Sequence, residues 1–152
     1  MRNRLHKSMM LISIIIIPIL LSCASAQQAP DETRLRLRFQ DFHTAMWSGD
    51  AKAFFEMTTP RFRSEKRLED IKKDMEEDKK SPRPARRAGL EKICHCRFVS
   101  DKMGKFFRCV LLVSITEDKP GGIQVQGLEI WEYIDREWYF MGGGEGEGCP
   151  QY

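Results

Sequence analysis

Two segments of alternating apolar and polar residues, EKICHCRFVS and KFFRCVLLVSITED, constrain the fold of this chain more than any other feature. Successive side chains of a β-strand point to opposite faces, so this alternation is typical of strands. Asp101–Gly104 separates the segments and predicts a hairpin with a four-residue loop, in which Ser100 faces Lys105. This register places Cys96 opposite Cys109 and predicts a disulfide, because directly opposed Cα atoms lie about 4.5–5.5 Å apart.

The same register gives the hairpin one apolar face, which we expect to face the core. This face consists of Cys94, Cys96, Phe98, Phe107, Cys109, Leu111, Val113 and Ile115. The reverse face carries Phe106, Val110 and Leu112 next to Val99, a contiguous apolar patch of the kind that marks an interface. The patch predicts a homodimer that forms through this outer face of the sheet.

The rest of the domain divides into helices and a second strand pair. Apolar residues at helical spacing predict helices over residues 31–48, 51–57 and 64–80, with Pro60 ending the second. Strands are expected at 123–134 and 137–141, joined by the two-residue turn Asp135-Arg136. Helices followed by a run of strands predict an α+β fold, with N-terminal helices packed on an antiparallel sheet.

The N-terminus has the pattern of an export signal. A basic head precedes the apolar run Met9–Leu21, which is too short to cross a membrane as a helix. Leu20-Leu21-Ser22-Cys23 resembles a bacterial lipobox, which makes Cys23 the lipid-modified first residue of the mature chain; cleavage after Ala24-Ser25-Ala26 is the alternative. We therefore expect a lipid-anchored cell-envelope protein, on the outer membrane facing the periplasm if the host has two membranes. The predicted parts are a signal peptide (1–22), a tether (23–30), one domain (31–141) and a glycine-rich tail (142–152).

The charge balance argues against a nucleic-acid partner. The chain has 25 basic and 22 acidic residues, and the three surplus cations, Arg2, Arg4 and Lys7, lie in the predicted signal peptide. The mature chain would therefore carry 22 of each sign. Its overall basicity comes from the signal peptide and does not indicate nucleic-acid binding.

Two longer segments carry a resemblance to a known family. MWSGDAKAFFEMTTPRF and GLEIWEYIDREWYFMG, in the order helices then strands, resemble the nuclear transport factor 2-like superfamily, which includes ketosteroid isomerase and polyketide cyclases. The resemblance implies a cystatin-like cone, in which a strongly bent sheet wraps the helices around a pocket, and it also implies a dimer. Members of this family include enzymes, ligand binders and structural domains, so the fold alone leaves the function open.

A pocket of this kind would be lined mainly by large apolar side chains. The expected lining is Leu35, Phe39, Phe42, Met46, Phe107, Leu111, Trp131 and Tyr133. One carboxylate joins it: Glu129 if the third strand is regular, or Glu132 if Gly127 forms a bulge. Phe42 stands where the family's isomerases carry a tyrosine, so their oxyanion donor is missing.

Two functions from different classes follow from this pocket. The first is a non-enzymatic module that binds a small apolar ligand or an envelope protein. The second is a small isomerase-like or hydrolase-like enzyme that uses His43 with Glu129 or Glu132 as acid–base residues. An ionisable pair that converges inside the pocket would favour the enzyme.

The remaining motifs favour disulfides over metal or cofactor sites. In Cys94-His95-Cys96 the two cysteines point to one face of a strand and His95 to the other, so the three cannot chelate one ion together. Cysteines of an exported protein more simply form disulfides, and Cys94 could reach Cys149 if the tail folds back over the sheet. No helix follows the glycines at 142–144 that would make them a phosphate loop. The sequence predicts no metal and no cofactor.

Overall fold

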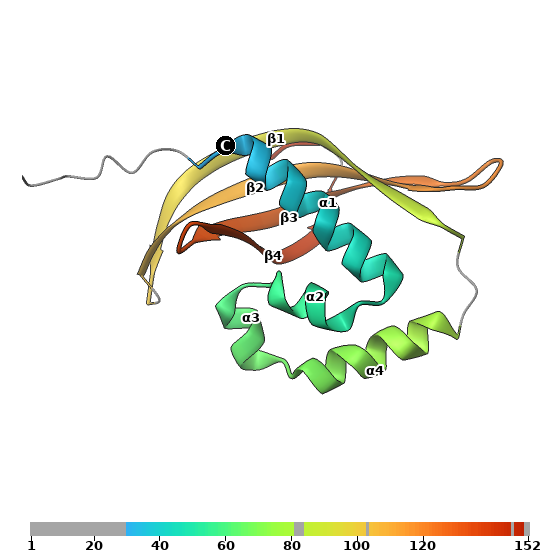
Figure 1. Ribbon diagram of the computed structural model, residues 1–152. Coiled ribbons are helices and arrows are strands. Elements are labelled where there is room, and N and C mark those ends of the chain that lie inside the picture. Colours follow the sequence, from blue (N-terminus) through green and yellow to red (C-terminus); the bar gives the residue numbers. More distant parts are fainter. Residues whose placement is uncertain (1–29, 81–83, 103, 147, 151–152) are drawn as a thin grey trace, which may run out of the picture.

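Helices precede strands along the chain, as the sequence predicts (Figure 1). The computed structural model describes residues 30–80, 84–102, 104–146 and 148–150. Within them the helices are α1 (Glu32–Ser48), α2 (Ala51–Glu56), α3 (Pro60–Glu65) and α4 (Leu68–Lys79). The strands are β1 (Arg86–Asp101), β2 (Gly104–Glu117), β3 (Gln124–Ile134) and β4 (Glu137–Glu145). They form one antiparallel sheet in the order β1-β2-β3-β4, so the α+β prediction is confirmed.

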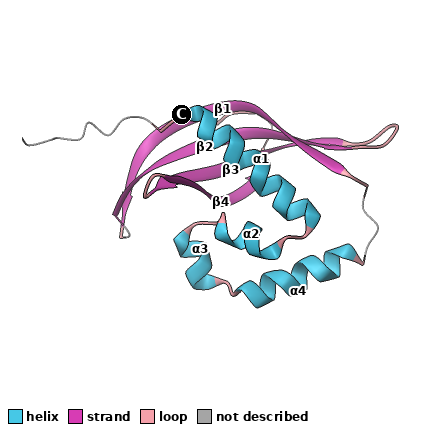
Figure 2. Ribbon diagram, in the orientation of Figure 1, coloured by secondary structure: helices cyan, strands magenta, loops and turns pink. Residues whose placement is uncertain are grey.

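The helices lie on one face of a bent sheet, with α1 running across it and α4 packed against α2 (Figure 2). The ends of α1 follow from its sequence: the Asp31 carboxylate accepts a hydrogen bond from Thr33 N at 2.8 Å, and Gly49 ends the helix at φ 73°. The buried side of α1 packs on β2, β3 and β4. The resulting core is Leu35, Phe39, Phe42, Ala45, Met57, Cys109, Leu111, Val113, Trp131 and Trp138.

The segment after α2 differs from the prediction. Pro60 begins α3 rather than only ending α2, because Thr59 accepts a hydrogen bond from Phe62 N at 3.2 Å and a proline is tolerated in the first helical turn. The backbone of Lys66 and Arg67 is extended, so the single helix predicted over 64–80 is two helices. The residues before α3 also pair with the edge of β4, since Thr59 N donates to Phe140 O at 3.0 Å.

The hairpin register is the predicted one from its loop as far as His95, which pairs with Val110. Beyond that point two irregularities shift β1, one between Ile93 and His95 and one between Leu90 and Lys92. The predicted core face is buried only on β2. Cys96 and Phe98 are exposed on β1, because β1 is an edge strand and they lie beyond the part of it that packs against the core.

The outer face of the sheet carries no exposed patch at the predicted place. Phe106 and Val110 are buried within the chain, and the guanidinium of Arg108 lies 5.3 Å from the centre of the Phe106 ring. The expectation of an exposed patch there was therefore wrong, since a neighbouring side chain covers part of it. The predicted homodimer stays a prediction, without this surface as its basis.

The fourth strand is longer than predicted and takes up the start of the glycine-rich tail. Gly142, Gly143 and Gly144 pair with β3, with Gly143 opposite Glu129. Glycine still forms backbone hydrogen bonds in a sheet, so the strand continues past residue 141, where the sequence predicts its end. A Cβ on Gly146 would lie 2.8 Å from the Leu128 side chain, which shows how closely the tail follows the sheet.

Two disulfides join the described cysteines. Cys96 is bonded to Cys109 across the hairpin, with Cα atoms 4.1 Å apart, which is the pairing that the hairpin register predicts. Cys94 is bonded to Cys149 with Cα atoms 5.3 Å apart, so the tail does fold back to β1.

The predicted signal peptide, Cys23 and all of the tether except Pro30 lie outside the described residues. Within the described ranges, no helix is both long and apolar enough to cross a membrane.

Candidate functional site

A hydrogen-bonded group of polar side chains lies inside the core. His43 Nε2 is 2.8 Å from Glu129 Oε1, and Trp131 Nε1 donates to Glu129 Oε2 at 2.9 Å. β3 pairs regularly with β2 across Gly127, so Glu129 shares the inner face with Trp131 and no bulge occurs at Gly127. The register shift lies instead on β4 at Met141, the extra residue opposite Ile130 and Trp131.

This group is closed off from solvent. His43 is 3% exposed and Glu129 6% exposed, and the His43 ring lies 4.6 Å from the Phe39 ring and 5.0 Å from the Trp47 ring, measured between centres. His43 Nε2 and Glu129 Oε1 share one hydrogen bond, and His43 Nδ1 has no partner among the described residues. The two predicted acid–base residues thus meet, but they meet inside packed side chains and not beside a cavity.

Glu132 is also buried, but it lies on the opposite face of β3. Its carboxylate accepts two hydrogen bonds from Arg108, from Nε at 2.9 Å and from Nη2 at 2.5 Å. The Glu132 side chain is 8% exposed and that of Arg108 is 23% exposed. The Glu132 carboxylate is therefore already held in an ion pair by a cation of the protein.

The side chains predicted to line an interior pocket divide between the core and a cavity. Leu35, Phe39, Phe42, Leu111 and Trp131 are at most 1% exposed and pack on one another, and Met46 packs against this cluster from its edge. Rings from α1, β3 and β4 fill the space, since the Phe42 ring lies 4.3 Å from the Phe140 ring and 5.4 Å from the Trp131 ring. Of the eight predicted residues, Phe107 and Tyr133 line the cavity described next.

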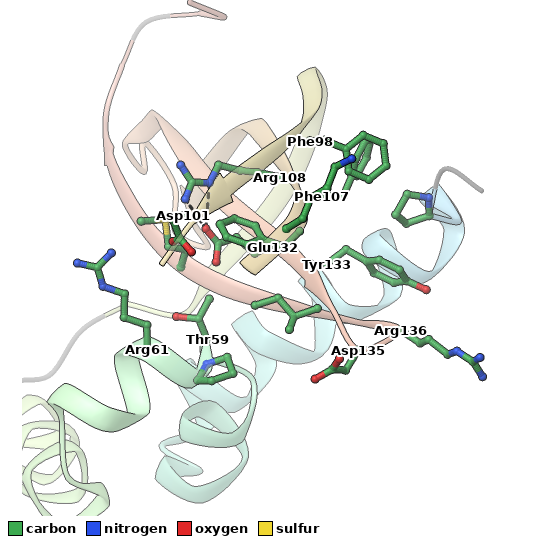
Figure 3. Close-up of a pocket in the computed structure, with 16 residues that line it drawn as sticks. Thr59, Arg61, Phe98, Asp101, Phe107, Arg108, Glu132, Tyr133, Asp135 and Arg136 are labelled. Atoms are coloured by element: carbon green, nitrogen blue, oxygen red, sulfur yellow. Dashed lines mark hydrogen bonds and ion pairs between the residues drawn. The ribbon is translucent and has the colours of Figure 1, made fainter. Parts of the chain in front are cut away.

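A cavity of about 530 Å³ lies at the end of the sheet that holds the β3–β4 turn (Figure 3). Its wall comes from the β1–β2 hairpin, the β3–β4 hairpin, the start of α3 and Pro30 before α1. The volume is within the range of small-molecule sites, about 300–1,000 Å³. The lining residues are Pro30, Thr59, Pro60, Arg61, Phe98, Asp101, Lys105, Phe106, Phe107, Arg108, Glu132, Tyr133, Ile134, Asp135, Arg136 and Met141.

One part of the cavity, which we call the aromatic lobe, is formed by Phe98, Phe107 and Tyr133. Figure 3 shows these rings toward the right of the view with Arg136, whereas Arg61, Asp101 and Arg108 lie toward the left. The Phe98 and Phe107 rings are 4.9 Å apart between centres, at 65° to each other. Lys105 Nζ lies 5.1 Å from the centre of the Phe98 ring, so a cation borders this apolar wall.

The turn at the cavity rim has an unusual backbone. Asp135 and Arg136 have φ values of 51° and 71°, and they are the non-glycine residues with positive φ in the described part of the chain. A two-residue hairpin turn with both angles positive favours Asn-Gly or Asp-Gly, because side chains other than Asn and Asp are disfavoured there. The arginine therefore costs stability where a glycine would fit.

Sequence reasoning missed most of the cavity. It found the turn Asp135-Arg136 but not that an arginine at its second position departs from the turn's usual composition, which was the available signal. It placed Phe98 in the core, whereas that ring is 42% exposed and lines the cavity. No group of three or more metal-ligating side chains occurs among the residues described.

Comparisons of this chain with family models, curated proteins and solved structures give no match.

Proposed function

We propose that this protein is an exported, lipid-anchored envelope protein whose domain binds a small apolar ligand without chemistry. The observation that carries the proposal is the separation of the cavity from the buried ionisable pair. The cavity is lined by four aromatic residues, three of them in the aromatic lobe, and neither His43 nor Glu129 belongs to its lining. An apolar wall with a few polar groups at its edge is typical of ligand-binding sites.

The alternative, an enzyme that uses His43 with Glu129 or Glu132, is less well supported by this arrangement. A general base must come within about 2.6–3.2 Å of the proton that it removes. His43 and Glu129 are surrounded by core side chains, and Glu132 is held by Arg108. The buried pair is better explained as a structural element that links α1 to β3.

The bent sheet with helices on one face supports assignment to the nuclear transport factor 2-like superfamily, with the sheet wrapped as a cone (Figure 1). The homodimer is proposed from this resemblance alone.

Ligand binding can be tested with the neutral fluorophore N-phenyl-1-naphthylamine and the full chain carrying Cys23→Ala, which cannot be acylated at residue 23. We expect saturable fluorescence enhancement, and Phe98→Ser should weaken binding by about tenfold, because roughly 1.5–3 kcal/mol of apolar burial is lost when a large side chain is removed. Leu37→Ser is the matched control, since Leu37 is 57% exposed and does not line the cavity. Equal binding by the two variants would contradict the proposal. Native mass spectrometry of protein from its own membrane should then identify a retained molecule.

The anchor is tested separately. Acyl chains contribute about 0.8 kcal/mol per buried CH₂, and lasting attachment takes more than one chain. Cys23→Ala should therefore release the domain from membranes or block its processing, with unchanged circular dichroism. A Cys23→Ala chain that is cleaved after Ala26 and still sediments with membranes would contradict the lipid anchor.

A further inference from the structure

We infer that the ligand is an anionic amphiphile, with its apolar chain against the aromatic lobe and its anionic group at Arg136 on the cavity rim (Figure 3); this inference rests on the proposed function.

The cations of the cavity differ in whether they already have a carboxylate partner. Arg108 is bonded to Glu132, and Arg61 Nε lies 3.2 Å from Glu65 Oε1. In the part of the chain that the structure describes, neither Lys105 nor Arg136 forms an ion pair with a carboxylate. A ligand anion can therefore bind Arg136 without first displacing a carboxylate of the protein.

The backbone conformation of Arg136 is a second, independent reason to place the ligand's anionic group at this residue. At φ 71° an arginine is disfavoured relative to glycine, so the fold itself gains nothing from this residue at this position. Disfavoured backbone conformations of this kind cluster at functional sites, where the side chain serves a purpose other than stability. The guanidinium is well suited to a carboxylate or phosphate, because its donors match the geometry of two oxygens.

The position of the cavity fits a ligand that comes from a membrane. Pro30 lines the cavity, and it lies seven residues after Cys23. At full extension these residues span at most about 25 Å, so a lipid anchor at Cys23 would hold the cavity near the membrane surface. Amphiphiles with one apolar chain exchange between membranes and water, and the aromatic lobe offers an apolar surface of matching character.

The test is displacement of N-phenyl-1-naphthylamine from the full chain carrying Cys23→Ala, with three competitors. Decanoate has both the chain and the anion, 1-decanol has the chain alone, and acetate has the anion alone. We expect decanoate to displace the fluorophore at lower concentration than 1-decanol, and acetate to have no effect. Arg136→Gln should raise the half-displacing concentration of decanoate about fivefold and leave that of 1-decanol unchanged.

Two further variants test whether the effect on decanoate binding is specific to Arg136. Arg36→Gln removes a surface cation that has a carboxylate partner, Glu32, and does not line the cavity, so it should leave displacement by decanoate unchanged. Arg136→Gly should lose affinity for decanoate while its melting temperature rises, a combination that a structural role for Arg136 does not produce.

The outcomes separate this inference from the proposed function. Equal displacement by decanoate and 1-decanol, unchanged in Arg136→Gln, would overturn the inference and leave the binding module intact. Failure of the fluorophore and both chain compounds to bind would overturn the proposed function itself. Arg136-dependent binding to phosphatidylglycerol vesicles without displacement by decanoate would overturn the inference in favour of a membrane-surface contact.

Discussion

Replacing His43 with alanine is expected to lower the free energy of unfolding by about 3–5 kcal/mol, the cost of breaking a buried pair by removing one partner. The variant leaves the Glu129 carboxylate 6% exposed with Trp131 Nε1 as its remaining side-chain donor. It also removes a ring that packs between Phe39 and Trp47. Urea unfolding followed by tryptophan fluorescence measures the change.

A double-mutant cycle separates the hydrogen bond from the packing. The double variant His43→Leu/Glu129→Leu removes both polar groups and leaves no buried charge behind. Its loss in free energy of unfolding should therefore be smaller, by at least about 1 kcal/mol, than the sum of the losses in His43→Leu and Glu129→Leu. Glu32→Ala is the surface control. It breaks the exposed Glu32–Arg36 pair at 2.6 Å and should cost less than about 1 kcal/mol. Additivity in the cycle would mean that His43 and Glu129 do not interact in solution.

Removal of the Cys94–Cys149 disulfide should also be strongly destabilising. The two residues are 55 apart in sequence, against 13 for Cys96 and Cys109. In the chain-entropy model the longer loop contributes about 4 kcal/mol and the shorter about 3 kcal/mol. Cys94→Ala/Cys149→Ala should therefore lower the free energy of unfolding more than Cys96→Ala/Cys109→Ala does.

Removal of the two disulfides should also increase local flexibility in different parts of the structure. Loss of Cys94–Cys149 frees the segment after β4, so we expect faster amide hydrogen exchange at Gly146 and Gly148 in that variant alone. Peptide mapping without reduction is the control for connectivity. Finding Cys96 linked to Cys94 or Cys149 would contradict the hairpin register, and equal exchange of the tail in both variants would contradict its tethering by Cys149.

Local sequence patterns were sufficient to predict several helices and strands, because the residues that determine these elements lie close together in the sequence. Asp31 and Gly49 mark the ends of α1, and Asp50 caps α2 by accepting from Ala53 N at 3.0 Å. The loop at 101–104 set the register that pairs Cys96 with Cys109, since strand alternation carries a register along a hairpin until a bulge interrupts it. The same reasoning failed beyond His95, where β1 shifts twice.

What the sequence determined is therefore the class of fold, the first helix and the hairpin with its disulfide, all of which depend on contacts between near neighbours. Tertiary structure alone decided which apolar side chains form the core and which line a cavity, because that depends on where α1 crosses the sheet. Sequence patterns place Phe42 on the apolar side of a helix and Phe98 on the apolar face of a strand, yet Phe42 is buried and Phe98 is exposed. The position of Arg136 depends on tertiary structure in the same way, since this residue joins Lys105 and Pro30 in the lining of one cavity only after the chain has folded.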